Sequence, residues 1–197
     1  YGLNAGHLGF LLNERSPLEG LDQDLVVGHV PLLYVETVSM DGQRHSAVAF
    51  NDTWVERATG QAAWLRVTIN GQERLPLLVA DGALVATAAG STAYARAMGA
   101  PPLPLNTPAL LLVGSNVLKP DTWRPAVLPL DASIELTTLD PTKRPLQAYI
   151  DGVPEGNVTT LRARVSNIAA VELVFSSGHD HAAKLAQIQF PQGRVEN

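Results

Sequence analysis

Apolar and polar residues alternate with a period of two along most of this chain, and no other feature constrains its fold as strongly. In 62-AAWLRVTIN-70, every second residue from Ala63 to Ile69 is apolar, while the residues between them are mostly polar. Such alternation is typical of a β-strand that buries one face and exposes the other. The chain therefore reads as a set of half-buried strands.

Turn dipeptides divide the alternating stretches into hairpins. Asp41-Gly42 and Asn70-Gly71 each favour the two-residue turn that joins antiparallel strands. The strands that these turns join are expected over 30–40 with 44–51, and 62–70 with 73–79. Further strands are expected over 83–86, 132–139, 145–150, 161–165 and 171–175. The pattern predicts a mainly β fold of the α+β kind: two packed β-sheets of short, mostly antiparallel strands with a few short helices.

Helix signals are few. Ser16 with Pro17 at the first helical position predicts a short helix to about Asp24. Ser91 or Thr92 is expected to cap a helix through 98 that Gly99 ends, and a last helix is expected over 179–190.

Composition excludes several classes of protein. The chain has 197 residues, 46% of them apolar and 17% charged, as in a compact globule. A net charge of −5 without a cluster of Lys or Arg argues against nucleic-acid binding. There is no cysteine, which excludes disulfides and zinc-thiolate sites, and no apolar run long enough to cross a membrane. A cytoplasmic location fits these features.

The stretch 80-ADGALVATAAGSTAYARAMGA-100 places small residues and hydroxyls where a strand turns into a helix. Free amides at the start of such a helix favour a phosphate or another oxygen-rich group. The same pattern also describes an ordinary capped turn, and it lacks the Gly-Lys-Ser/Thr ending of a P-loop.

Two other motifs leave alternatives open. Asn51-Asp52 offers an amide beside a carboxylate, which suits a vicinal diol but is also common in turns. His179 and His181 stand at i and i+2, a spacing that does not face both side chains to one side of a helix. A metal site there is the weaker interpretation.

Together, five segments resemble the NAD kinase family in its C-terminal, NAD-binding portion. The fourteen-residue segment from Asp81 to Tyr94 is the most specific, because the family reads D-G-L-I-V-A-T-P-T-G-S-T-A-Y there. The matching segments are 2-GLNAGHLGFL-11, 49-AFND-52, 81-DGALVATAAGSTAY-94, 123-WRP-125 and 149-YIDG-152. They follow the family's order and cover most of the chain. Where the family usually has Asn-Glu, this chain has Asn51-Asp52.

The resemblance implies phosphoryl transfer from ATP or polyphosphate to the 2′-hydroxyl of the adenosine ribose of NAD, which gives NADP. By motif match, Asn51 and Asp52 would hold that ribose, and Thr92, Ala93 and Tyr94 would line the adenosine pocket. The coenzyme-binding residues implied by the motifs further include Asp81, which opens the site, Asp151, and Trp123, an aromatic that in the family reaches a neighbouring subunit's site. The resemblance also implies a homodimer or homotetramer.

The resemblance also implies a division of the chain into two parts. Residues 1–13 would be the end of an N-terminal α/β lobe, and 14–197 the β-rich NAD-binding domain. The family's Gly-Gly-Asp-Gly motif, which carries its catalytic aspartate, is absent. The donor site for ATP with Mg²⁺ is then expected to lie largely outside this chain, so we expect weak dinucleotide binding and no turnover by the chain alone.

Two alternatives stay open. The chain could be a catalytically silent nucleotide-binding or assembly module, or a protein of the diacylglycerol and lipid kinase-like group. The Asn51-Asp52 and Gly-Ser-Thr-Ala-Tyr motifs favour the NAD-specific branch over the lipid kinases.

Overall fold

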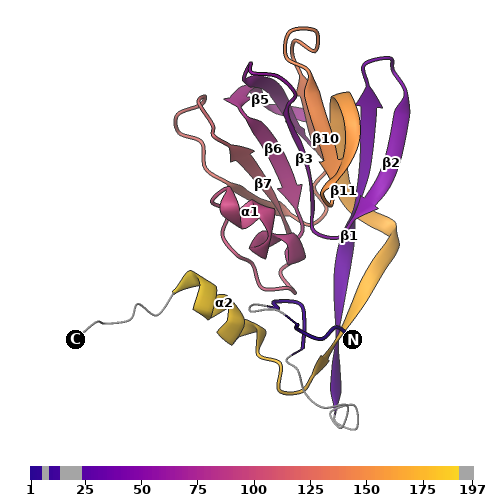
Figure 1. Ribbon diagram of the computed structural model, residues 1–197, viewed down its shortest axis with the longest axis vertical. Coiled ribbons are helices and arrows are strands. Elements are labelled where there is room, and N and C mark those ends of the chain that lie inside the picture. The colour runs from indigo at the N-terminus through magenta and orange to yellow at the C-terminus, as the bar shows by residue number, and fades with distance from the viewer. Residues whose placement is uncertain (6–8, 14–23, 191–197) are drawn as a thin grey trace, which may run out of the picture.

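The computed structural model describes residues 1–5, 9–13 and 24–190, so the helix expected over 16–24 lies outside the described residues. Within them, eleven strands dominate the fold (Figure 1). The strands are β1 (Leu25–Ser39), β2 (Arg44–Ala49), β3 (Asp52–Arg57), β4 (Ala63–Ile69), β5 (Gln72–Ala80), β6 (Gly82–Ala86), β7 (Ala109–Ser115), β8 (Ala126–Pro129), β9 (Ile134–Thr138), β10 (Leu146–Ile150) and β11 (Val153–Ser176). Three short helical elements accompany the strands: η2 (Ala89–Thr92) and α1 (Tyr94–Ala97) between β6 and β7, and α2 (His181–Gln189) after β11.

The predicted mainly β fold of antiparallel strands is confirmed. Hydrogen bonds join the strands into one continuous sheet in the order β5-β4-β9-β11-β10-β3-β6-β7-β8, with β1 and β2 branching from β11. The sheet curls, because the backbone of Val79 in the edge strand β5 pairs with Lys119 in the segment after β7. What the sequence suggests as two packed sheets is thus one sheet that closes on itself around a core.

The two-residue turn expected at Asn70-Gly71 is confirmed, whereas the hairpin at Asp41-Gly42 has a longer loop, in which Ser39 bonds to Gln43. Asn70 and Gly71 both have positive φ, 52° and 74°, as a type I′ turn between β4 and β5 requires. Gly42, with φ of 84°, turns the chain between β1 and β2.

The two separate strands expected over 161–165 and 171–175 are wrong. They belong to the single strand β11, which pairs with β1 along both their lengths through a register shift near Pro31. Residues 166–169, which lie between the two expected strands, have no partner in β1 and form an irregularity in the ladder without ending the strand. Figure 1 shows this two-stranded ribbon extending below the rest of the sheet toward α2.

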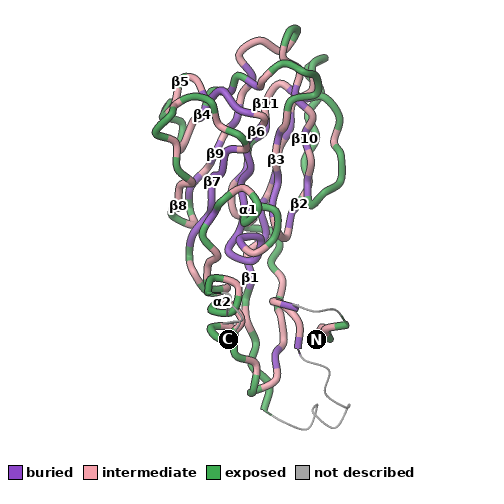
Figure 2. The backbone as a smooth tube through the Cα atoms, turned by 60° about the vertical axis from the view of Figure 1, so that its left-hand side comes forward, coloured by how far each residue is buried: buried purple, intermediate pink, exposed green. Residues whose placement is uncertain are grey.

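The core lies inside the curl and under α1. The main cluster takes its fully buried side chains from opposite parts of the sheet, among them Leu33, Leu65 and Leu146. A smaller cluster around Leu84 and Leu111 packs on the other face of β6 and β7, where α1 covers it. Both faces of β6 are therefore buried, as its unbroken apolar sequence predicts (Figure 2).

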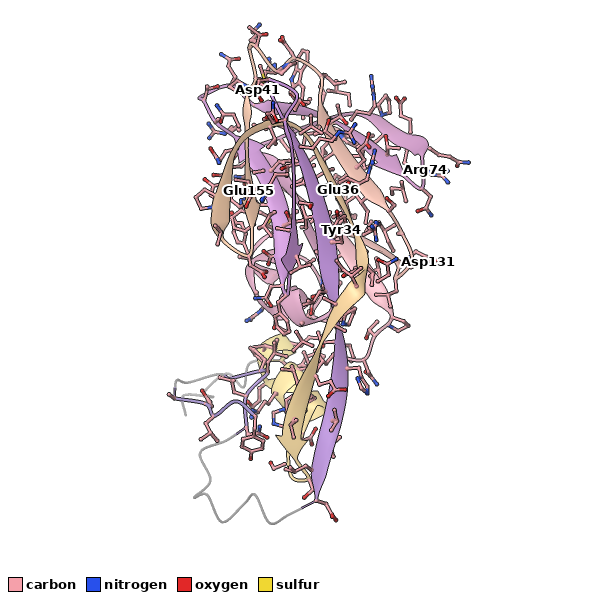
Figure 3. The ribbon with its side chains drawn as sticks, turned by 90° about the vertical axis from the view of Figure 1, so that its right-hand side faces the viewer. Tyr34, Glu36, Asp41, Arg74, Asp131 and Glu155 are labelled. Carbon is pink, nitrogen blue, oxygen red and sulfur yellow. The ribbon has the colours of Figure 1, made fainter. Side chains whose placement is uncertain are left out.

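The outer face of β1 is polar, as Figure 3 shows for Tyr34 and Glu36. The guanidinium of Arg164 in β11 lies 4.5 Å from the centre of the Tyr34 ring, a cation–π contact across the strand pair. Arg162 forms an ion pair with Glu135 on the neighbouring strand.

The predicted capping of a helix by Ser91 or Thr92 is wrong. Residues 89–92 form the 3₁₀ turn η2, and α1 begins only at Tyr94, with Ala93 preceding it and no side-chain cap. The Ser91 hydroxyl is used otherwise: it donates to the carbonyl of Ala88 and accepts from the amide of Leu103. Gly99, with φ of 86°, ends the helix as expected.

The last helix is confirmed as α2, with the carboxylate of Asp180 accepting from the amide of Ala183 at its start. Lys184 in α2 donates to the carbonyls of Gly9 and Leu12, and the Asn13 side chain bonds to Val174 and Ser176 at the end of β11. The N-terminal segment therefore packs beside α2. None of the helices in the described residues has the length and apolar character needed to cross a membrane.

Candidate functional site

Three segments from distant parts of the sequence meet at one end of β6. Asp52, the first residue of β3, pairs with Ala86, the last residue of β6. The turn between β10 and β11 lies on the other side of β3, because Ile150 pairs with Thr53. The η2–α1 segment follows β6 directly, so the Asn51-Asp52 and Gly-Ser-Thr-Ala-Tyr motifs become neighbours.

The Asp151 carboxylate anchors the Asn51-Asp52 backbone. It accepts from the amides of Phe50, Asn51 and Asp52 at 2.6, 2.8 and 3.2 Å, and the amide of Asp151 donates back to the carbonyl of Asp52. Asp151 has φ of 47°, the left-handed conformation that Asp tolerates in a turn. Its role in the fold is therefore to fix the backbone from which the Asn51 and Asp52 side chains project.

Thr87 and Gly90 hold the same backbone from the other side. The Thr87 hydroxyl donates to the carbonyl of Phe50 at 2.8 Å, and the Thr87 amide donates to the carbonyl of Asn51. The Gly90 amide donates to the Thr87 hydroxyl. A Cβ on Gly90 would lie 2.1 Å from the carbonyl oxygen of Asn51, so only glycine permits this close approach.

These bonds correct one expectation about the strand-to-helix turn. The amides of Thr87, Gly90, Ser91 and Ala93 have acceptors within the chain, and the residues from Thr87 to Ser91 are buried. They are not free to hold a phosphate. The small residues and hydroxyls serve instead to pack η2 against the Asn51 backbone.

The Asp52 carboxylate is the most unusual group of the site. Asp52 is buried, with 4% of its surface exposed, and among the described residues no hydrogen bond stabilises its charged form. Burial raises the pKa of Asp52 from its ordinary 3.8 to about 6, and the nearby charge of Asp151 adds to this shift. A buried carboxylate without donors is costly, which makes it a candidate for binding hydroxyl groups of a ligand.

Tyr94, the first residue of α1, contacts Trp54, which stands two residues after Asp52 in β3. Its side chain is 41% exposed, and its ring meets the edge of Trp54 with centroids 5.1 Å apart. Ala93 is exposed and Thr92 is half-buried, with the Thr92 hydroxyl directed back to the carbonyl of Ala89. The structure thus brings together six of the eight residues implied by the motifs: Asn51, Asp52, Thr92, Ala93, Tyr94 and Asp151.

Asp81 and Trp123 lie elsewhere. Asp81 precedes β6, whose length separates it from Thr87 by roughly 20 Å. Its carboxylate bonds to Arg57 and Asn116, and both contacts hold the pKa of Asp81 below its ordinary value. Trp123 packs over Gly114 near the same end of β6. Neither residue reaches the Asp52 site within one chain.

Sequence reasoning missed Trp54 and Tyr149. The two residues are paired across β3 and β10, and their rings stack with centroids 4.7 Å apart and an interplanar angle of 12°. The available signal was period two: Trp54 stands two residues after Asp52, and Tyr149 two before Asp151, so all four belong to one face. The register between β3 and β10 could not be read from the sequence.

A metal site is not supported in the part of the chain that the structure describes, where no three His, Asp or Glu side chains are grouped to hold an ion. His179 and His181 pack against Phe175, and burial lowers the pKa of His181. An apolar groove of about 640 Å³ lies between β1, residues 104–106 and α2. Its lining offers few polar groups for a dinucleotide.

Comparison with known proteins adds independent evidence. The NAD kinases of Rickettsia bellii and Rickettsia typhi are 37% and 38% identical to this chain over 193 residues, which cover 96% of this chain and 75% of each relative. No family model matches the chain.

Solved structures share the fold. Yeast NADH kinase complexed with NADH superposes with a TM-score of 0.82 at 19% identity, covering 99% of this chain and 60% of the yeast chain. An NAD kinase from Archaeoglobus fulgidus in complex with ATP superposes with a TM-score of 0.69, also at 19% identity, covering 96% of this chain and 71% of that one. Because the sequence relatives are more than 30% identical over three quarters of their length, this chain belongs to the NAD kinase family.

Proposed function

We propose that this chain is the NAD-binding part of an NAD kinase, which transfers a phosphoryl group from ATP or polyphosphate to the 2′-hydroxyl of the adenosine ribose of NAD. The buried Asp52 carboxylate carries this proposal, because no hydrogen bond from the described residues stabilises its charge and the neighbouring Asn51 backbone contacts the segment that leads to Tyr94. The names of the Rickettsia relatives and the NADH bound to the yeast enzyme agree with it.

In this proposal the ribose diol donates to the Asp52 carboxylate, and the Asn51 amide completes the contact. A carboxylate accepts two hydroxyl donors with its two oxygens, which suits a vicinal diol. Thr92, Ala93 and the Tyr94 ring then border the adenosine. The Asp151 carboxylate acts through the backbone, since its oxygens are occupied by three amides.

Asp81 and Trp123 fit the same coenzyme only if they come from a second copy of the chain, because roughly 20 Å of β6 separates them from Asp52. The homodimer or homotetramer and the cytoplasmic location stay predictions. The assignment of residues 1–13 to an N-terminal lobe and of residues 14–197 to the NAD-binding domain also stays a prediction.

Phosphoryl transfer depends on positioning the donor and stabilising charge. The described residues contain no grouped acidic ligands for the Mg²⁺ that accompanies ATP. We therefore expect the chain to bind NAD weakly and to form no NADP by itself. Calorimetric titration with NAD and a coupled assay of NADP formation, supplied with ATP or with polyphosphate, test both statements.

The outcomes separate the alternatives. Weak NAD binding without NADP formation supports the proposal. Tighter binding of a soluble diacylglycerol analogue than of NAD would favour a lipid kinase-like protein. Robust NADP formation by this chain would contradict the expected inactivity while leaving NAD as the substrate.

A further inference from the structure

Three aromatic side chains form a continuous row beside the Asp52 carboxylate. Tyr149 of β10 stacks on Trp54 of β3 at 4.7 Å, and the ring of Tyr94 meets Trp54 at 5.1 Å and 66°, in edge-to-face geometry. We name Tyr149, Trp54 and Tyr94 the aromatic row. It joins the sheet to the η2–α1 segment.

The far end of the row is fixed by a carboxylate. A hydrogen bond between the Tyr149 hydroxyl and Glu56 raises the pKa of Tyr149 above its ordinary value. Glu56 stands two residues after Trp54 on the same strand, so its side chain lies on the same face of β3. Tyr149 is thus held by its ring against Trp54, with Glu56 near its hydroxyl.

The near end of the row has little support of its own. Helix α1 is a single turn of four residues without a side-chain cap, and Tyr94 is its first residue. A helix this short is not stable by itself. Tyr94 is 41% exposed, and its ring contacts the ring of Trp54. The orientation of that ring therefore depends on Trp54.

The packing of Trp54 fixes its own ring, so that this ring can orient the ring of Tyr94. Its side chain packs against the buried cluster around Leu84 and Leu111. Its indole N–H is buried without an acceptor in the described part of the chain, so stacking and packing hold the ring. Aromatic pairs of this geometry stabilise a fold by more than the burial of their apolar area alone.

We propose that Trp54 is a positioning residue that fixes the plane of the Tyr94 ring for the base of the dinucleotide, and that Tyr149 and Glu56 fix Trp54 in turn. This inference rests on the proposed function, because it assigns Tyr94 to the base of NAD. Of the residues it names, Trp54 and Glu56 lie outside every motif matched in the sequence. Replacing Trp54 with a smaller residue should therefore weaken NAD binding, although Trp54 does not itself contact the reacting phosphoryl group.

The variants Trp54→Phe, Trp54→Leu and Tyr149→Leu test this in the full chain by calorimetric titration with NAD. Phenylalanine keeps a ring against Tyr94, so Trp54→Phe should bind within about 2-fold of the unsubstituted chain, whereas either leucine variant should lose about 3- to 10-fold. Trp64→Leu is the matched control, because Trp64 is 37% exposed and contacts Arg144 away from the site.

Tryptophan fluorescence gives a second readout that a change in stability alone does not move. NAD should quench the emission of the unsubstituted chain and of Trp64→Phe, and most of that quenching should vanish in Trp54→Phe although this variant still binds. The inference is overturned if NAD binds but neither quenching nor affinity depends on Trp54, and the proposed function then stands. Failure of NAD to bind the unsubstituted chain would overturn both.

Discussion

Replacing Asp52 with asparagine should stabilise the fold at pH 8 and at the same time weaken NAD binding. The carboxylate is buried beside Asp151, no hydrogen bond from the described residues stabilises its charge, and its pKa is raised to about 6. Ionising it therefore costs folding free energy, which a neutral amide avoids. We expect Asp52→Asn to raise the free energy of unfolding at pH 8 by about 1–3 kcal/mol, less any cost of burying the amide.

Because the pKa of Asp52 is raised in the folded state, the stability of the unsubstituted protein depends on pH. The folded state holds the Asp52 proton up to about pH 6, whereas the unfolded chain releases it near 3.8. The unsubstituted protein therefore loses stability as the pH rises through this window, and Asp52→Asn should not. Urea unfolding at pH 4 and pH 8 measures the difference, which should be small at pH 4 and largest at pH 8.

Binding should change in the opposite direction. Asparagine has one acceptor oxygen and no charge, so a diol loses a charge-assisted contact, and NAD affinity at pH 8 should fall about 10- to 100-fold. NAD affinity of the unsubstituted chain should also fall below pH 6, as Asp52 becomes protonated. Asp131→Asn is the control, since Asp131 is exposed at the turn before β9 (Figure 3). An Asp52→Asn variant that is destabilised at pH 8 and binds NAD normally would contradict the assignment.

Replacing Gly90 with alanine should disrupt both folding and binding. The added Cβ would lie 2.1 Å from the carbonyl oxygen of Asn51 and 2.6 Å from its carbon, so the Asn51 backbone must move. That backbone also bonds to Asp151 and Thr87. We expect a loss of about 2–4 kcal/mol in unfolding free energy and at least a tenfold loss of NAD affinity, measured by urea unfolding and calorimetry.

Two glycines serve as matched controls. Gly60→Ala adds a Cβ that meets nothing within 4 Å and should change the unfolding free energy by less than about 0.5 kcal/mol. Gly82→Ala creates a similar clash, 2.2 Å from the carbonyl oxygen of Val55, but at the opposite end of β6. It should destabilise the protein while its folded fraction keeps NAD affinity. Equal losses of affinity in Gly82→Ala and Gly90→Ala would show that binding merely follows stability.

Local chemistry explains which parts of the fold the sequence could predict. The Asp41-Gly42 and Asn70-Gly71 turns and their strands follow from dipeptide preference and period two, which need no distant partner. The unbroken strand β11 could not be predicted, because its continuity depends on pairing with β1, more than a hundred residues away. Likewise, the sequence could not show that the strands form one curled sheet and not two, because the pairing of distant strands decides this.

The candidate site, too, could be predicted only in part from the sequence. Family motifs pointed to Asn51, Asp52 and Tyr94, and the structure brings them together. The amides of Thr87, Gly90, Ser91 and Ala93 are not free as expected, because the carbonyl of the distant Asn51 and groups within the segment accept from them. The burial of Asp52 and the stacking of Trp54 on Tyr149 arise from strand register between segments about a hundred residues apart.

A crystal structure of this chain with NAD at saturating concentration would show whether Asp52 binds the coenzyme. We expect the adenosine ribose with its hydroxyls within hydrogen-bond distance of the Asp52 carboxylate and the base beside the Tyr94 ring. NAD found instead in the apolar groove between β1 and α2, or an empty Asp52 site at saturation, would contradict it.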